Sequence, residues 1–195
     1  MLLIIFLVLG YLIGSINSAI IVCKLMHLPS PRTLGSGNPG ATNVLRTGSK
    51  LATGLTLLGD ILKGVIALTI ARFAHLPEVS LAWIALATIL GHVTPIYHNF
   101  KGGKGVATLL GVLLALNLWL GILGLITWVV IAAFFRYSSL AAIIATILMP
   151  FYAIFLLPHA CLMPLSLISL LVLCRHLGNI LRLIKGQEKK IGRKS

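Results

Sequence analysis

Apolar residues fill most of the chain in long runs, which short polar or charged segments separate. A run of about 20 residues with few charges is long enough to cross the hydrocarbon core of a bilayer, which is roughly 30 Å thick. Such runs predict transmembrane helices at approximately 2–23, 51–71, 80–97, 138–157 and 160–181. We therefore expect an all-α, polytopic membrane protein that forms a single domain over residues 1–195.

The apolar stretch 105–135 is long for one helix and short for two. Lysine and arginine collect in the cytoplasmic loops of membrane proteins, so charge distinguishes the two possibilities. Two short helices, with a break near 117–121, place the basic loops at 24–50 and 101–104 and the basic C-terminal tail on one side. The pattern thus predicts a bundle of seven transmembrane helices, with the N-terminus outside and the C-terminus cytoplasmic.

The chain is strongly basic, with a net charge of +13 from 16 Lys and Arg against 3 Asp and Glu, and its mean hydropathy is +1.06. Part of this charge is the bias of cytoplasmic loops, and anionic membrane lipids are its natural partners. Nucleic acid is disfavoured because we expect no soluble domain to carry a binding face. The three cysteines have neither disulfide nor metal-ligand spacing, and we expect no metal and no cofactor.

Three polar segments fall on the predicted cytoplasmic side, and the first is GSGNPGATNVLR at 35–46. Glycines let backbone amides approach an anion, Ser36 and Asn38 add donors, and Arg46 offers a bidentate contact to phosphate. The G-x-G-x-x-G spacing here does not indicate a dinucleotide site, because a membrane span and not a strand precedes it. The alternative is a glycine-rich loop in which the arginine only sets the topology.

The second segment, GHVTPIYHNFKGGKGVAT at 91–108, places three glycines and Lys104 directly before an apolar helix. A helix N-terminus with a nearby lysine is a ready site for an anion. In the third segment, RHLGNILRLIKGQEKK at 175–190, His176, Asn179 and Arg182 recur at i, i+3 and i+6 and so share a helical face. A juxtamembrane basic segment is the alternative interpretation of this third cluster.

One further pair of charges lies inside the second predicted span. Asp60 and Lys63 stand at i, i+3 spacing. An isolated charge near the middle of a membrane helix costs roughly 2.5–3.5 kcal/mol on insertion scales. We therefore expect the two side chains to neutralise each other and to have a structural role.

The three segments resemble, in order, the motifs of the bacterial acyl-phosphate:glycerol-3-phosphate acyltransferase family: SGNPGATNVLR, GH..P....FKGGKGVAT and H..NI.RL..G.E. The resemblance covers nearly the whole chain. It implies a seven-span enzyme of the bacterial inner membrane with a cytoplasmic-side site, which makes lysophosphatidic acid and phosphate from acyl phosphate and glycerol 3-phosphate. This is the first acylation step of phospholipid biosynthesis, and we expect a monomer to perform it.

The resemblance also implies roles for individual residues. The catalytic set is Lys104, His176 and Asn179. The substrate-binding set comes from the first two segments: Ser36, Gly37, Asn38, Gly40, Asn43, Arg46, Gly102, Gly103 and Gly105. Within it, Ser36 and Arg46 bind the phosphate of glycerol 3-phosphate together with Lys104, helped by His176 and Asn179. The amides of the three later glycines bind acyl-phosphate oxygens. The other members of the first segment shape its loop: Gly37, Asn38, Gly40 and Asn43. Structural roles fall to Asp60, Lys63 and Glu188.

The chemistry that this set suits is direct attack of the glycerol hydroxyl on the mixed anhydride, assisted by fixed positive charge. Two proton acceptors stay open, His176 and a substrate phosphate, and we favour the phosphate. The main rival function is transport of an organic phosphate. Transport sites tend to lie at the bilayer midplane between structural repeats, whereas these clusters lie at one face and no repeat is visible.

Overall fold

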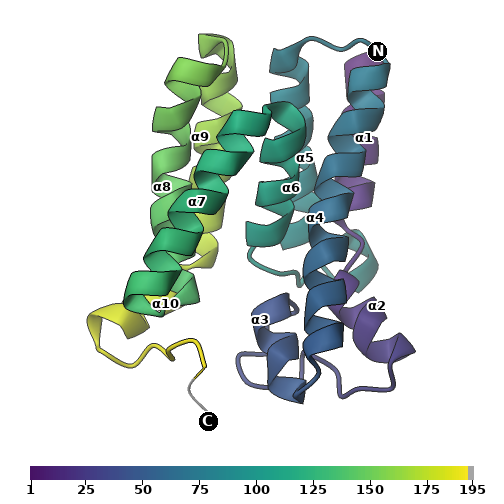
Figure 1. Ribbon diagram of the computed structural model, residues 1–195. Helices are drawn as coiled ribbons and strands as arrows, with labels where there is room; N and C mark the ends of the chain where they lie inside the picture. The colour runs from purple at the N-terminus through teal and green to yellow at the C-terminus, as the bar shows by residue number, and fades with distance from the viewer. Residues whose placement is uncertain (193–195) are drawn as a thin grey trace.

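The protein is a bundle of α-helices whose long members stand side by side along one axis (Figure 1). The structure is a computed structural model and describes residues 1–192. In that part of the chain the α-helices are α1 (Leu2–Gly14), α2 (Ser18–Leu25), α3 (Ala41–Val44), α4 (Lys50–Phe73), α5 (Glu78–Val93), α6 (Val106–Leu116), α7 (Leu118–Phe135), α8 (Ser138–Leu156), α9 (Leu162–Arg175) and α10 (Leu177–Ile184).

The lengths and compositions of these helices suit a membrane. Four segments are long and apolar enough to cross a bilayer, namely α4, α7, α8 and the segment Glu78–His98 that contains α5. The bent pairs α1–α2 and α9–α10 raise the number of candidate spans to six. Large apolar side chains point outward, and only 11% of α7 is buried. Since these side chains need an apolar surrounding, the prediction of an all-α polytopic membrane protein is confirmed.

The predicted break in the stretch 105–135 is confirmed at Asn117, between α6 and α7. The Asn117 side chain accepts a hydrogen bond from the amide of Leu120 (3.1 Å) and donates one to the carbonyl of Leu156 (3.3 Å). It therefore caps the start of α7, as asparagine commonly does. The helix before it, α6, has 11 residues and is shorter than a full crossing.

Two spans predicted as continuous helices are bent, and the first bend lies at Ser15–Asn17. There α1 and α2 meet at 40°. The Asn17 side chain caps α2 by accepting from the amide of Ile20 (3.1 Å). The carbonyl of Ile16 accepts from Nζ of Lys63 in α4 (2.7 Å). An apolar run does not reveal this bend, because the partner that uses the carbonyl lies 47 residues further along the chain.

The second bend, of 57°, lies at His176 between α9 and α10. The carbonyl of Val172 would normally accept from the backbone amide four residues later, but Nδ1 of His176 donates to it instead (2.8 Å). The His176 amide donates to Leu173 (2.9 Å), which tightens the last turn. His176 is thus the N-cap of α10, on which Asn179 and Arg182 lie, and its carbonyl accepts from the amides of Asn179 (2.8 Å) and Ile180 (2.9 Å).

The helices approach closely at glycines. A Cβ atom on Gly14 of α1 would overlap the backbone of Thr88 in α5, and one on Gly111 of α6 would overlap Ile61 in α4. Small residues at such crossings let membrane helices pack by van der Waals contact. These crossings pack α1 against α5 and α6 against α4, and contacts of α4 with α1 and α5 join the two pairs.

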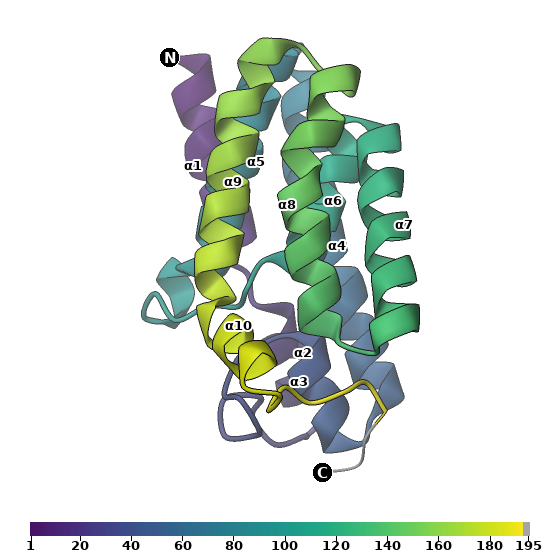
Figure 2. The ribbon, with the colours of Figure 1, turned by 90° about the vertical axis from the view of Figure 1, so that its left-hand side faces the viewer.

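The polar segments gather at one end of this bundle. Helices α2, α3 and α10 lie at the lower end in Figures 1 and 2, together with the last residues described, whereas residue 1 lies at the upper end. Segments 35–46 and 175–190 thus come side by side although they are far apart in the sequence.

Candidate active site

The first loop is organised by the side chain of Asn43, which is only 3% exposed. Its amide nitrogen donates to the carbonyls of Pro31 and Leu34, the latter at 2.9 Å. Its amide oxygen accepts from the amide of Ser36 (3.3 Å) and from Nη1 of Arg46 (3.1 Å). One buried side chain therefore positions both phosphate-binding candidates of this loop, in line with the shaping role expected for Asn43.

Glycine at position 35 allows the arginine to fold back over the loop. Gly35 and Gly37 adopt positive φ angles of 52° and 67°, which favour glycine. A Cβ on Gly35 would overlap Nη1 of Arg46 and lie 2.7 Å from its Cζ. The loop then closes with a hydrogen bond from the amide of Gly40 to the carbonyl of Asn38 (3.0 Å), just before α3.

The second loop packs its glycines directly on the end of α5. The amide of Gly102 donates to the carbonyl of Val93 (3.1 Å), and the amide of Gly103 donates to that of His92 (3.2 Å). These two N–H groups are therefore engaged within the protein, which differs from the expectation that they bind acyl-phosphate oxygens. Close packing explains these glycines instead, since a Cβ on either would overlap His92. Gly105 has φ 87° where the chain turns into α6.

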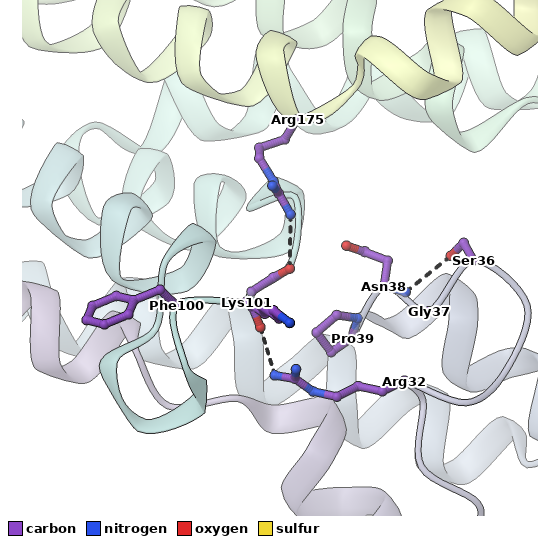
Figure 3. A pocket seen from close by; sticks show the side chains of 9 residues that line it. Arg32, Ser36, Gly37, Asn38, Pro39, Phe100, Lys101 and Arg175 are labelled. Carbon is purple, nitrogen blue, oxygen red and sulfur yellow. Dashed lines mark hydrogen bonds between the residues drawn. The ribbon is translucent and has the colours of Figure 1, made fainter.

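Two arginines hold the other side of this loop through its carbonyls. Nη2 of Arg32 donates to the carbonyl of Lys101 (2.8 Å). The guanidinium of Arg175 donates to the carbonyls of Gly103 (3.3 Å) and Gly102 (3.2 Å). Figure 3 shows both arginines reaching the loop, one from each side. The second polar segment is thereby tied to Arg32, which precedes the first segment, and to the end of α9.

A chain of short hydrogen bonds connects the second and third segments. Nζ of Lys104 donates to the amide oxygen of Asn179 (2.6 Å), and the amide nitrogen of Asn179 donates to Glu188 (2.6 Å). Glu188 also accepts from Ser139 of α8 (2.7 Å) and from Nε of Arg182 (2.7 Å). Glu188 thus holds Arg182 by an ion pair, in line with a structural role, and its carboxylate also fixes the orientation of the Asn179 amide that meets Lys104.

The charges of this network oppose one another. Burial lowers the pKa of Lys104 to about 8, the charge of Glu188 raises it, and the positive charges of Arg182, Arg175 and Arg46 lower it further. Burial raises the pKa of Glu188, but the hydrogen bonds from its three donors and the charge of Arg182 outweigh burial and hold it below its usual range. Lys104 is consequently a cation near neutral pH that loses its proton in mild alkali.

His176 lies buried beside this network, with 2% of its surface exposed. Because Nδ1 donates to the carbonyl of Val172, Nε2 is the ring nitrogen left for a substrate.

A pocket of about 430 Å³ opens between the three segments (Figure 3). Its nine lining residues are Arg32, Ser36, Gly37, Asn38, Pro39, Phe100, Lys101, Gly102 and Arg175. Three of them are cations and none is acidic. Four were predicted from the sequence, but the three cations were not, because charge bias alone accounts for basic residues in a cytoplasmic loop. The other predicted catalytic and substrate-binding residues lie outside this lining set: Gly40, Asn43, Arg46, Gly103, Lys104, Gly105, His176 and Asn179.

The predicted ion pair inside α4 is confirmed. Nζ of Lys63 lies 3.0 Å from Oδ1 of Asp60, and both side chains are at least 95% buried. His92 of α5 joins them, with Nδ1 2.8 Å from Nζ of Lys63.

Known proteins resemble this chain over nearly its full length. The family model described as glycerol-3-phosphate acyltransferase matches residues 4–186. A glycerol-3-phosphate acyltransferase of Coxiella burnetii is 48% identical over 188 residues, covering 96% of this chain and 97% of the relative. One of Francisella tularensis subsp. novicida is 51% identical over 189 residues, covering 97% and 93%.

Two crystal structures of PlsY, an integral membrane glycerol 3-phosphate acyltransferase, share the fold. The glycerol 3-phosphate form has a TM-score of 0.91 at 37% identity and covers 97% of this chain and 96% of its own. The lysophosphatidic acid form has a TM-score of 0.89 at 36% identity, covering 97% and 95%. Sequence and fold together place the chain, with its three polar segments at one end of a membrane helix bundle, in the glycerol-3-phosphate acyltransferase family.

Proposed function

We propose that this enzyme transfers an acyl chain from acyl phosphate to the 1-hydroxyl of glycerol 3-phosphate and releases lysophosphatidic acid and inorganic phosphate. The observation that carries the proposal is the pocket between the three polar segments, because its three cations and no acids suit phosphorylated substrates. Lys104, two residues after Gly102 of the pocket lining, adds a cation that Asn179 holds by a hydrogen bond. The solved relatives support the acceptor and the product, since PlsY was crystallised in a glycerol 3-phosphate form and a lysophosphatidic acid form.

In the proposed reaction the glycerol oxygen attacks the carbonyl carbon of the mixed anhydride. A carbon–oxygen bond forms to glycerol, the bond from the carbonyl carbon to the phosphate oxygen breaks, and the electron pair leaves with phosphate. Arg46 and Ser36, both positioned by Asn43, bind the phosphate of glycerol 3-phosphate. Lys104 stabilises the negative charge that develops, and a fixed donor of this kind is typically worth about 10²–10³-fold in rate.

The hydroxyl proton passes to a phosphate oxygen in the mechanism that we favour. A phosphate with a second pKa near ~6 is a competent acceptor. Nε2 of His176 is the alternative acceptor, since Nδ1 is held by Val172. His176→Gln distinguishes them: a near-normal kcat with a raised KM excludes the histidine as base, whereas loss of kcat with unchanged KM assigns it that role.

The proposed topology has seven crossings, with the N-terminus outside and the active site on the cytoplasmic side of the bacterial inner membrane. An odd number is supported by the first and the last described residues, which lie at opposite ends of the bundle (Figure 1). The short α6 supplies the crossing that length alone does not count. A monomer suffices, because all three polar segments that line the pocket come from one chain.

Purified protein in lipid, given palmitoyl phosphate and labelled glycerol 3-phosphate, tests the function. We expect lysophosphatidic acid and phosphate to appear in equal amounts, and palmitoyl-CoA to be inactive as the control donor. Activity with palmitoyl-CoA alone would reassign the donor. Saturable binding of glycerol 3-phosphate with no product, and its accumulation in protein-loaded liposomes, would favour transport instead.

A further inference from the structure

A cluster of buried polar side chains lies within the bundle directly behind the second loop. Asp60 and Lys63 of α4 and His92 of α5 are each 6% exposed or less. Nζ of Lys63 contacts three acceptors: Oδ1 of Asp60 (3.0 Å), the carbonyl of Ile16 (2.7 Å) and Nδ1 of His92 (2.8 Å). Nζ therefore hydrogen-bonds the Ile16 carbonyl and His92, while its contact with Asp60 is an ion pair, in which Oδ1 of Asp60 has no hydrogen-bond partner among the described residues.

The contact with Lys63 determines the tautomer of His92. Because the ammonium only donates, Nδ1 must accept, and the ring proton of the neutral imidazole therefore lies on Nε2. The hydroxyl of Thr108 lies 3.1 Å from the same Nδ1. The opposite side of the ring faces the second loop, since the three atoms nearest to a Cβ built on Gly103 are Nε2, Cε1 and Cδ2 of His92.

The second loop thus contacts His92 in two ways: through a backbone hydrogen bond, and through close packing that is possible only because residue 103 has no side chain. The amide of Gly103 donates to the His92 carbonyl (3.2 Å), and its Cα packs on the imidazole. Lys104 is the next residue, and its ammonium must meet Asn179 at 2.6 Å. A shift of the loop relative to the ring would move this ammonium with it.

We propose that His92 is a positioning residue of the acyl transfer, held in place by Lys63 and Asp60, and that its ring is the support that sets the position of Lys104. The inference rests on the proposed function. The His92 side chain neither lines the pocket nor belongs to the hydrogen-bonded network of Lys104, Asn179 and Glu188. The buried charges of α4 thereby act on the site through one imidazole.

A double-mutant cycle between positions 92 and 103 tests the proposal. His92→Asn keeps an oxygen for Lys63 in place of Nδ1 but removes the two ring atoms nearest to Gly103. We expect about a tenfold loss of kcat for His92→Asn. We expect about a hundredfold loss for Gly103→Ala, since a displacement near 1 Å can have that cost. The double variant should lose only about tenfold, because the added methyl group occupies the space that the ring leaves.

Gly102→Ala is the matched control for the cycle. A Cβ there would overlap the backbone carbonyl of His92 and lie 2.6 Å from Cδ of Pro95. No side-chain change at position 92 removes these atoms, so His92→Asn should not rescue Gly102→Ala. Additive losses at 92 and 103, or equal rescue at 102 and 103, would overturn the proposal.

The pH profile separates positioning from a loss of folded protein. The charged groups that bear on Lys104 are Glu188, Arg182, Arg175 and Arg46, and His92→Asn alters none of them. When the loop shifts, Lys104 becomes more exposed, its pKa rises from about 8, and the alkaline limb of kcat moves to higher pH. An unmoved limb in His92→Asn, with kcat near that of the wild type, would also overturn the proposal.

The design also separates this inference from the proposed function. Wild-type turnover of palmitoyl phosphate tests the function alone, and the cycle is read only relative to that rate. Thermal unfolding in detergent checks that each variant is folded. If His92→Asn does not fold, His92→Ser vacates the same ring position and enters the cycle in its place. If both fail, the alkaline limb of Gly103→Ala decides, since the proposal requires that limb to move as well.

Discussion

Replacing Glu188 by glutamine should shift the pH dependence of the enzyme without unfolding it. Glu188 accepts through Oε1 from Ser139 and Asn179 and through Oε2 from Arg182. Glutamine keeps the oxygen for the first two donors but presents its amide nitrogen to Arg182. That arginine is 45% exposed, so the lost ion pair costs only about 1 kcal/mol or less.

The larger effect falls on Lys104, because the negative charge of Glu188 raises its pKa. With a pKa of about 8, roughly nine-tenths of the Lys104 side chains are protonated at pH 7 and about half at pH 8. Removal of the carboxylate charge lowers this pKa. If this pKa falls by one unit, activity that needs the cation falls about twofold at pH 7 but about fivefold at pH 8.

The assay is kcat with palmitoyl phosphate between pH 6 and 9 at saturating substrates. We expect the alkaline limb of Glu188→Gln to move to lower pH, opposite to the shift expected for His92→Asn. Ser139→Ala is the matched control, since it removes one hydrogen bond to Glu188 but no charge, and its limb should stay in place. A limb of Glu188→Gln that is unmoved or shifted to higher pH would refute the reasoning.

Four further outcomes follow from the site and the bundle. Lys104→Ala should lower kcat by about 10²–10³-fold, measured at saturating substrates, and a loss confined to KM would contradict its role in the transition state. Asn43→Ala leaves buried polar groups of the first loop without hydrogen-bond partners, which costs about 1–3 kcal/mol. The KM for glycerol 3-phosphate should therefore rise roughly tenfold to a hundredfold. An unchanged KM would show that the loop does not bind this substrate. Lys63→Met should lower the free energy of unfolding by about 3–5 kcal/mol, because it leaves the buried Asp60 carboxylate without its partner. The double variant Asp60→Asn with Lys63→Met should recover most of the thermal stability. Equal losses in the single and double variants would argue against the ion pair. The ionised Glu188 carboxylate should make the wild type more stable to unfolding than Glu188→Gln. This extra stability should be fully present above pH 4.5, the ordinary pKa of that carboxyl, and should be lost as the pH falls through its lowered pKa.

Several local features follow from the sequence because their partners are close along the chain. The pairing of Asp60 and Lys63 needs only the i, i+3 spacing of one helix. The break at Asn117 follows from the distribution of lysine and arginine between the loops, and asparagine is a suitable cap there. The polar and basic character of the three segments depends on residue type alone, so their order and composition were sufficient to indicate the family.

The functions of individual residues depend on partners far along the chain. Gly102 and Gly103 were predicted to bind an anion, but in the structure their amides donate to the carbonyls of Val93 and His92, and a side chain on either would overlap His92. The bend at His176 arises because a side chain takes a carbonyl that the backbone would otherwise use. The pattern of hydrophobic residues predicts neither the packing of these glycines nor this bend.

The sequence by itself determined which segments are apolar enough to enter a membrane and which carry the polar and basic residues, since hydrophobicity and local charge are properties of residue type and near neighbours. Only the tertiary structure decided which polar groups meet. Lys104 reaches Asn179 across 75 residues, and Lys63 reaches Ile16 and His92 across 47 and 29. Such hydrogen bonds require distances near 3 Å, and these distances are set by how the glycine-packed helices cross and not by the spacing of residues along the chain.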